Sequence, residues 1–182
     1  RIGATTASFV LRSSEQQREL AAISVLPEGA SVLSLVSRPC PDSWSDLRRD
    51  HLPGMAIVRR DAFTNGQWDI AGQQLIRIRY TASAPYSADP SQLVYPTRCP
   101  DEGSNFQQAI ADFPRSAFDY VWTIGFRPGA AHAPDLHLIW SNGESALYKV
   151  SQGGSRSISD TSPITAARAE VGRSFAAEQT GF

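Results

Sequence analysis

The sequence contains no long apolar run, and its charges nearly cancel. No stretch reaches the roughly 18 consecutive apolar residues that a membrane-spanning helix needs, and no basic segment followed by an apolar one marks a signal peptide. The 17 Lys and Arg residues stand against 18 Asp and Glu residues, for a net charge of −1. Because nucleic-acid and anionic-membrane binders usually carry a basic surplus, we expect no nucleic acid as a partner.

Signature motifs of several large enzyme classes are also missing. The sequence has no glycine-rich dinucleotide motif, no P-loop, no G-x-S-x-G elbow and no H-E-x-x-H motif. His132 and His137, with Asp135 between them, could in principle reach one metal ion, but they lack regular ligand spacing. We therefore interpret them as ordinary surface or packing residues and expect neither a metal nor a cofactor.

The chain is long enough for one domain with its own core. Its 182 residues are 41% hydrophobic, which suits a single domain better than two. We place that domain at residues 1–150. Residues 151–182 are rich in Ser, Gly and Ala, with a weak helical pattern at 165–177, and predict a loosely attached tail. The chain begins at Arg1 rather than Met, so we expect a processed protein or a piece of a longer one.

The first half of the chain alternates predicted helix and strand. Apolar residues spaced on one helical face predict a helix over residues 14–26, which ends at the Pro-Glu-Gly sequence that follows. The continuous apolar run at 32–36 predicts a strand buried on both faces. The segment MAIVRR at 55–60 predicts a second strand, and the alternation of apolar and polar residues at 73–80 predicts an edge strand.

A long loop and a second helix follow. Four prolines at 81–103 predict a loop with a short extended piece at 93–95. The segment 104–115 predicts a helix with Ser104 as its N-cap and Pro114 at its end.

The last part of the predicted domain is a strand and a hairpin. Aromatic and β-branched residues predict a strand at 118–126. Two further strands at 136–150 are joined around Asn142-Gly143, a pair favoured in type I′ turns. Together these elements predict an α/β fold: a single three-layer domain with a mixed, mainly parallel sheet and a C-terminal antiparallel hairpin.

The two cysteines, Cys40 and Cys99, are too far apart in sequence for a C-x-x-C pair. A disulfide between them would close a loop of about 60 residues, stabilise the fold by roughly 4 kcal/mol and indicate an oxidising compartment. The alternative is two free thiols in a cytoplasmic protein. No His-rich segment accompanies either cysteine, so we do not expect a nucleophile.

Polar side chains gather after the strand predicted at 55–60, and open α/β sheets bind ligands at such carboxyl ends. The candidate binding residues are Arg59, Arg60, Asp61, Asn65, Gln67 and Trp68. In this hypothesis an arginine holds an anionic or sugar group, Asp61 accepts hydroxyl hydrogens and Trp68 stacks on a ring. The alternative is an Arg-Asp pair that orients a loop beneath an aromatic lid.

We expect no catalytic residue on this chain. One competing hypothesis is an independent periplasmic hydrolase that uses Asp61 or Asp119 with a histidine. Asp119, at the start of a predicted strand, has the alternative role of tying down a neighbouring loop. Another hypothesis is a cytoplasmic interaction module, in which both thiols are free.

Several blocks resemble a known kind of protein. HLPGMAIVRRDAF, DPSQLV, FPRSAFDYVWTIGF and SALYKV occur in this order after LPEGASVLSLV. Over about residues 15 to 150 they resemble the C-terminal soluble region of uncharacterised bacterial polytopic membrane proteins that look like multi-spanning glycosyltransferases with lipid-linked donors. The blocks are not catalytic signatures, and the acidic catalytic residues of such proteins are expected in loops between membrane helices.

The resemblance implies a location and a role. It places the chain on the extracytoplasmic, periplasmic side of a bacterial inner membrane, as a non-catalytic domain in cell-envelope glycan assembly. The implied partner is the membrane-embedded part of the same longer chain, with a saccharide or an envelope protein as a further contact.

Overall fold

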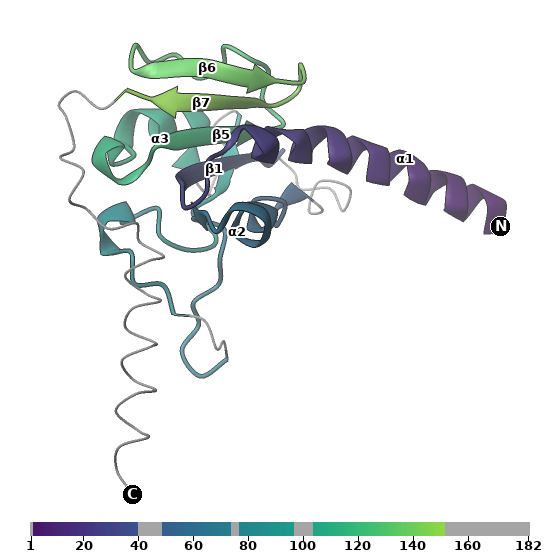
Figure 1. Ribbon diagram of the computed structural model, residues 1–182, viewed down its shortest axis with the longest axis horizontal. Helices are drawn as coiled ribbons and strands as arrows, with labels where there is room; N and C mark the ends of the chain where they lie inside the picture. Colours follow the sequence, from purple (N-terminus) through teal and green to yellow (C-terminus); the bar gives the residue numbers. More distant parts are fainter. Residues whose placement is uncertain (1, 40–48, 74–76, 97–103, 152–182) are drawn as a thin grey trace, which may run out of the picture.

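Strand β1 (Ser31–Ser37) lies at the centre of the fold and has parallel neighbours on both sides. The computed structural model describes residues 2–39, 49–73, 77–96 and 104–151 (Figure 1). The sheet order is β4 (Ser104–Asn105), β3 (Leu93–Tyr95), β1, β5 (Tyr120–Ile124), β7 (Ala146–Val150), β6 (Leu136–Ser141), with β2 (Phe63–Thr64) also paired to β1. The pairs among β1 to β5 are parallel, whereas β7 pairs antiparallel with β5 and β6. The predicted mixed sheet with a C-terminal hairpin is confirmed.

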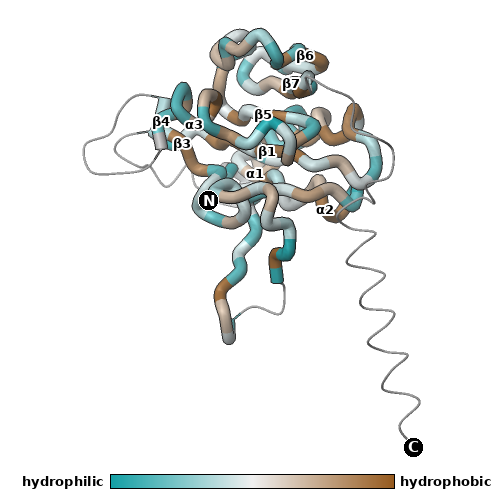
Figure 2. Tube along the Cα trace, turned by 90° about the vertical axis from the view of Figure 1, so that its left-hand side faces the viewer, coloured by the Kyte–Doolittle hydropathy of each residue, from teal (hydrophilic) through white to brown (hydrophobic). Residues whose placement is uncertain are grey.

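The side chains of β1 alternate between two apolar layers. Leu33 and Leu35 pack on one face with helix α3 (Phe106–Asp112). Val32 and Val36 pack on the other face with the 3-10 helix η1 (Ala21–Val25) and helix α2 (Gly54–Arg60). In Figure 2, β1 and β5 lie between α3 and α2. A strand covered on both faces favours apolar residues on both sides, which is why Val32, Leu33, Leu35 and Val36 flank the buried Ser34 in β1.

Residues 55–60 form helix α2 and not the predicted strand. Ala56 is fully buried against the core, whereas Val58 is 77% exposed. A buried and an exposed side chain two residues apart fit a helix, because residues two apart in a strand point to the same face. A four-residue apolar run does not by itself separate a helix from a strand, so the tertiary contact of Ala56 decided the structure.

The edge strand predicted at 73–80 is also wrong where it can be judged. Residues 74–76 lie outside the described residues, and residues 77–80 are in no strand. The backbone N–H of Ile78 donates to the Asp69 carboxylate, and the Tyr80 hydroxyl donates to the carbonyl of Ala117. The Asp69 side chain thus accepts the hydrogen bond from the Ile78 N–H that a neighbouring strand would otherwise accept.

Helix α1 (Ile2–Leu20) begins well before the predicted residue 14 and is followed directly by η1. The apolar face predicted for this segment comprised Leu11, Leu20, Ile23 and Leu26. The last three are buried as expected, but Leu11 is 64% exposed. The remainder of α1 projects away from the domain (Figure 1). No helix in the described part of the chain is both long and apolar enough to cross a membrane.

Two local predictions need correction. The N-cap of α3 is Asn105 and not Ser104, because the Asn105 side chain accepts a hydrogen bond from the N–H of Gln107 at 2.8 Å. The hairpin is confirmed, but its two-residue connection is Gly143-Glu144: Asn142 N–H donates to the carbonyl of Ser145, and only Gly143 has a positive φ, of 92°. Glycine at the first central position is the type II′ pattern.

Other predictions match or lie outside the described residues. The extended piece Leu93–Tyr95 and the strand Tyr120–Ile124 are confirmed. Cys40, Cys99 and the helical pattern at 165–177 lie outside the described residues, so the disulfide and the tail remain predictions.

Candidate functional site

On the side of β1 away from β5, the sheet continues with two short strands and a side chain between them, which together we call the strand lane. β2 pairs with the first residues of β1 and β3 with the last ones. Between them, the Ser34 N–H donates to Oδ1 of the fully buried Asn65 at 2.8 Å, and the Val36 N–H donates to the carbonyl of Gln92 at 2.7 Å. Asn65, predicted as a binding residue, therefore replaces a missing backbone acceptor within the sheet.

After this break the described residues 66–73 and 77–91 lie outside the sheet, and we call them the excursion. Hydrogen bonds join its two ends at a place that we call the neck. Asn65 Nδ2 donates to Ser91 Oγ at 3.2 Å, and the Asp89 N–H donates to the Gln67 carbonyl at 3.0 Å. Gln92 Nε2 donates to Asp89 Oδ1. The two ends of the excursion are thus fixed to each other as well as to β1.

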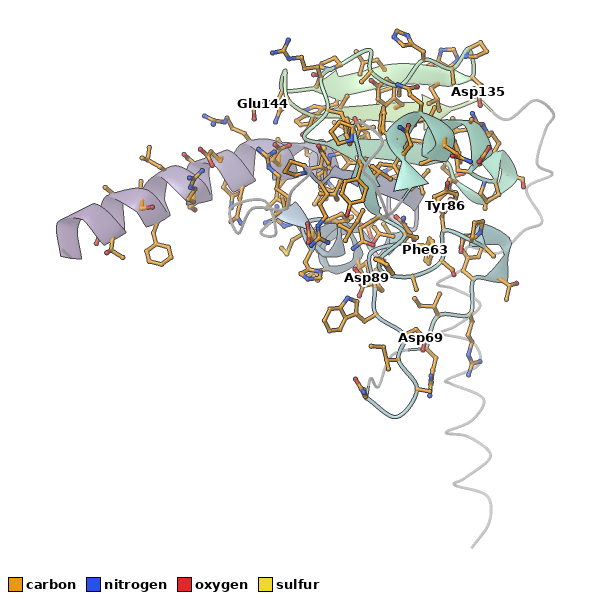
Figure 3. The ribbon with its side chains drawn as sticks, turned by 180° about the vertical axis from the view of Figure 1, so that it is seen from behind. Phe63, Asp69, Tyr86, Asp89, Asp135 and Glu144 are labelled. Carbon is orange, nitrogen blue, oxygen red and sulfur yellow. The ribbon has the colours of Figure 1, made fainter. Side chains whose placement is uncertain are left out.

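Trp68 stands on this excursion, 47% exposed, between two anchored neighbours. On one side is Gln67, whose carbonyl is held by Asp89. On the other side is Asp69, whose carboxylate accepts from the Ile78 N–H at 2.8 Å and from Arg77 at 3.0 Å. The hydrogen bond from Ile78, assisted by Arg77, lowers the pKa of Asp69. Figure 3 shows Asp89 close to the body of the domain and Asp69 farther out.

The segment that leads into α2 lies beside this position. His51 lies edge-on to the Trp68 ring, with ring centroids 5.9 Å apart and planes at 76°. Gln67 Nε2 lies 3.3 Å from where a Cβ on Gly54 would be, so its amide lies over the first turn of α2. An aromatic face is therefore accompanied by imidazole, amide and carboxylate groups.

The three charged candidates lie at the opposite end of α2. Arg60 donates from Nε to the Ile23 carbonyl at 3.1 Å and from Nη2 to the Ser24 carbonyl at 3.3 Å, so it ties α2 to η1. Asp61 caps α2 in the left-handed conformation, with φ 47°, and Arg59 points to solvent. Seven residues of helix span about 10 Å.

The six candidates therefore do not form one site. Gln67 and Trp68 lie together, Asn65 belongs to the sheet, and Arg59, Arg60 and Asp61 belong to the end of α2. The prediction that they converge depended on a strand at 55–60, which would have placed its following residues at one sheet edge.

Asp119 holds the start of two strands together. Its Oδ2 accepts hydrogen bonds from the Ser31 N–H at 3.1 Å and the Ser31 hydroxyl at 2.6 Å. This contact is at the amino ends of β1 and β5, whereas α/β sheets bind ligands at the carboxyl ends. The alternative role of Asp119, tying down a neighbouring segment, agrees with these contacts.

The carboxylate of Asp135 is hydrogen-bonded to Arg115. It accepts from Arg115 Nε at 2.9 Å. Burial would raise the pKa of Asp135, but the hydrogen bonds from Arg115 and from a backbone N–H, with the charges of Arg115 and His137, together outweigh burial and lower the pKa. Within the part of the chain that the structure describes, no group of three His, Cys, Asp or Glu residues is arranged to hold a metal ion.

A second polar cluster lies at the carboxyl ends of β1 and β5 and was missed by sequence reasoning. The buried Glu19, in the last turn of α1, lies 3.8 Å from Arg49, which lies 3.6 Å from Glu144. Asn142 Nδ2 donates to Glu19 Oε2 at 3.3 Å. The chain places β3 on one side of β1 and β5 on the other, so this is also where the strand order reverses.

Gly125, directly after β5, makes room for this cluster. Its φ is 78°, and a Cβ there would lie 3.0 Å from the Ser37 Cβ and 3.1 Å from Arg49 Nη1. A glycine directly after an aromatic-rich strand is the sequence signal that could have pointed to a close approach.

Comparison with known proteins adds no relative to these observations: no family model, curated protein or solved structure matches the chain.

Proposed function

We propose that this chain is a non-catalytic domain on the extracytoplasmic side of a bacterial inner membrane, within a longer glycosyltransferase-like membrane protein of cell-envelope glycan assembly. Its role there is binding or accessory. The sequence blocks that resemble such proteins support this proposal. The observation that carries it is the exposed apolar surface on the outer half of α1.

The outer half of α1 presents apolar side chains to solvent. Phe9, Val10 and Leu11 are 71%, 63% and 64% exposed. Residues 2–11 contain no charged side chain, and the first charge along α1 is Arg12. Three consecutive residues are spread over about 200° of a helix, so the apolar surface is broad, and the remaining side carries Thr5, Ser8 and Arg12. A helix with a broad exposed apolar face is typical of one that packs against an apolar environment.

Burial of this half-helix would release considerable free energy. Each large apolar side chain stabilises by about 1.5–3 kcal/mol when it is fully removed from water. A lone helix of this length is only marginally stable in water. The membrane-embedded part of the same longer chain, with the lipid around it, is the partner that matches both properties.

The inner end of α1 is fixed to the domain. Glu19 is held by Asn142 of the hairpin and faces Arg49, and Leu20 is buried in the core. Figure 3 shows Glu144, the other partner of Arg49, beside the inner end of α1. A helix anchored in this way leaves the domain in a set direction, as a membrane tether would.

Flotation with phosphatidylcholine vesicles tests whether α1 attaches the domain to lipid, and we call α1 in this role the tether. We expect the chain to float with the vesicles and a variant with Phe9→Ser, Val10→Ser and Leu11→Ser to stay in the aqueous fraction. Val58→Ser is the matched control, because Val58 is 77% exposed but lies on α2. It should float like the parent chain. Equal flotation of the parent and the triple variant would contradict the proposal.

A further inference from the structure

We infer that Trp68, together with Gln67, His51 and Asp89, forms a subsite for one pyranose ring of an uncharged oligosaccharide. This deepens the binding role proposed above and rests on it, but its evidence and its test do not involve α1. We call this subsite the Trp68 platform.

The first observation is that an exposed aromatic ring is held in place. The Gln67 carbonyl before Trp68 accepts from Asp89, and the Asp69 carboxylate after it accepts from Ile78 and Arg77. The His51 ring restrains the indole from the side. A large exposed ring on a fixed backbone loses little conformational entropy when a ligand stacks on it.

The second observation is the chemistry around the ring. Gln67 offers an amide, His51 an imidazole and Asp89 a carboxylate. Asp89 Oδ1 accepts from Gln92, and Oδ2 accepts no hydrogen bond from the residues that the structure describes. A sugar ring has an apolar C–H face, which suits an aromatic face, and a rim of hydroxyls, which suits planar polar groups. The arrangement therefore matches a sugar ring on both counts.

The third observation concerns charge. The two arginines predicted to hold an anionic group, Arg59 and Arg60, lie at the far end of α2, and Arg60 is bonded to η1. The carboxylates Asp69 and Asp89 lie on the same excursion as Trp68 (Figure 3). Arg77 and Arg79 on the same excursion balance these two carboxylates, so no surplus of positive charge is left to hold an anionic ligand, and the platform suits an uncharged saccharide.

The platform and the tether occupy different parts of the molecule. In Figure 1, α1 leaves the domain on one side, whereas the excursion after β2 extends from the domain in another direction. Attachment through α1 would therefore leave Trp68 accessible to a glycan in the aqueous phase.

The test uses the chain labelled with 5-fluorotryptophan and titrated with cellotetraose, chitotetraose and maltotetraose. The chain has four tryptophans, and ¹⁹F NMR observes each separately. The Trp68 signal is identified from its loss in Trp68→Phe. We expect at least one tetrasaccharide to shift this signal saturably, with a dissociation constant on the order of 1 mM, because one stacked ring with few hydrogen bonds binds weakly. The signals of Trp122, which is buried, and Trp140, on the hairpin, should not move.

Variants separate stacking from other contributions. Calorimetry with the responding sugar should show binding roughly tenfold or more weaker in Trp68→Ala and only about two- to fivefold weaker in Trp68→Phe, which keeps a flat ring. Val58→Ala, on the exposed side of α2, should bind like the parent. A Trp68 signal unmoved by all three sugars, or equal binding by Trp68→Ala, would overturn the inference. Vesicle flotation would be unaffected by either result, so failure here and failure of the tether are distinguishable.

Discussion

Asn142 at the hairpin tip donates a hydrogen bond from Nδ2 to Glu19 Oε2 at 3.3 Å, and so joins the end of α1 to a residue 123 positions later. Glu19 is a buried charged side chain, only 4% exposed. Its position explains how a projecting helix is connected rigidly to the sheet.

Asn142→Asp should destabilise the domain by about 1–3 kcal/mol at pH 7, because it replaces the donor with a second carboxylate beside a buried one. Oδ1 would still accept the turn hydrogen bonds from Glu144 and Ser145. The double variant Glu19→Gln with Asn142→Asp should regain much of the loss, since the amide introduced at position 19 can donate. Urea unfolding measures each step. A double variant no more stable than Asn142→Asp alone would refute the pairing.

Asn65→Ala should destabilise the domain by about 1–3 kcal/mol, because it leaves the buried Ser34 N–H without an acceptor. Gln107→Ala is the matched control: it also removes a side-chain amide that is hydrogen-bonded to the backbone, but there Nε2 donates to the Ala130 carbonyl and the position is exposed. We expect the control to lose no more than about 0.5 kcal/mol. Equal losses in urea unfolding would argue against the composite strand lane.

Gly125→Ala and Gly143→Ala form a matched pair. Both glycines have positive φ, 78° and 92°, so each alanine should cost about 1–2 kcal/mol of backbone strain. At Gly125 the new Cβ also meets Ser37 and Arg49, whereas at Gly143 it meets nothing within 4 Å. Thermal unfolding should therefore show Gly125→Ala to be the less stable variant by a further 1–3 kcal/mol or so. Similar stabilities would mean that the carboxyl edge is not closely packed.

The excursion that carries Trp68 should respond to acid through Asp69. The Ile78 N–H, with help from Arg77, lowers the pKa of the Asp69 carboxyl below its ordinary value of 3.8. A lowered folded-state pKa means that the stabilisation is complete above the unfolded value and is lost as the pH falls through the folded value. The Ile78 amide proton shift, followed by NMR from mildly acidic pH downwards, should titrate with a midpoint below 3.8. Asp69→Asn should abolish this titration, and a midpoint above the ordinary value would contradict the contact.

The predicted bridge between Cys40 and Cys99 can be tested by counting thiols in protein exported to a periplasm and denatured without reductant. We expect no free thiol before reduction and two after it, and a loss of stability by roughly 4 kcal/mol on reduction. Two free thiols before reduction would favour the cytoplasmic interaction module over an envelope domain.

Patterns confined to one element predicted well. The mainly apolar run at 32–36, with Ser34 at its centre, predicted a strand correctly because a position covered on both faces suits such a run. The hairpin at 136–150 was predictable because its strands are adjacent in sequence, although the turn formed one residue later than expected. The face of Leu20, Ile23 and Leu26 was predictable from helical spacing.

The site was harder to predict because it depends on distant contacts. Trp68 and Gln67 were identified from their residue types, but His51 and Asp89 reach them only because α2 is a helix and because the neck closes on Asn65. No local pattern encodes either condition. Reading 55–60 as a strand therefore combined residues that lie at opposite ends of one helix.

By itself the sequence determined the α/β class, the central buried strand and the hairpin, because hydrophobic periodicity acts between residues close along the chain. Only the tertiary structure decided that MAIVRR is a helix, that the Asn65 side chain completes a strand lane and that Glu19 meets Asn142. Those outcomes depend on which surfaces are left to be covered and which polar groups are left to be paired once the chain has folded, and both depend on all of the domain at once.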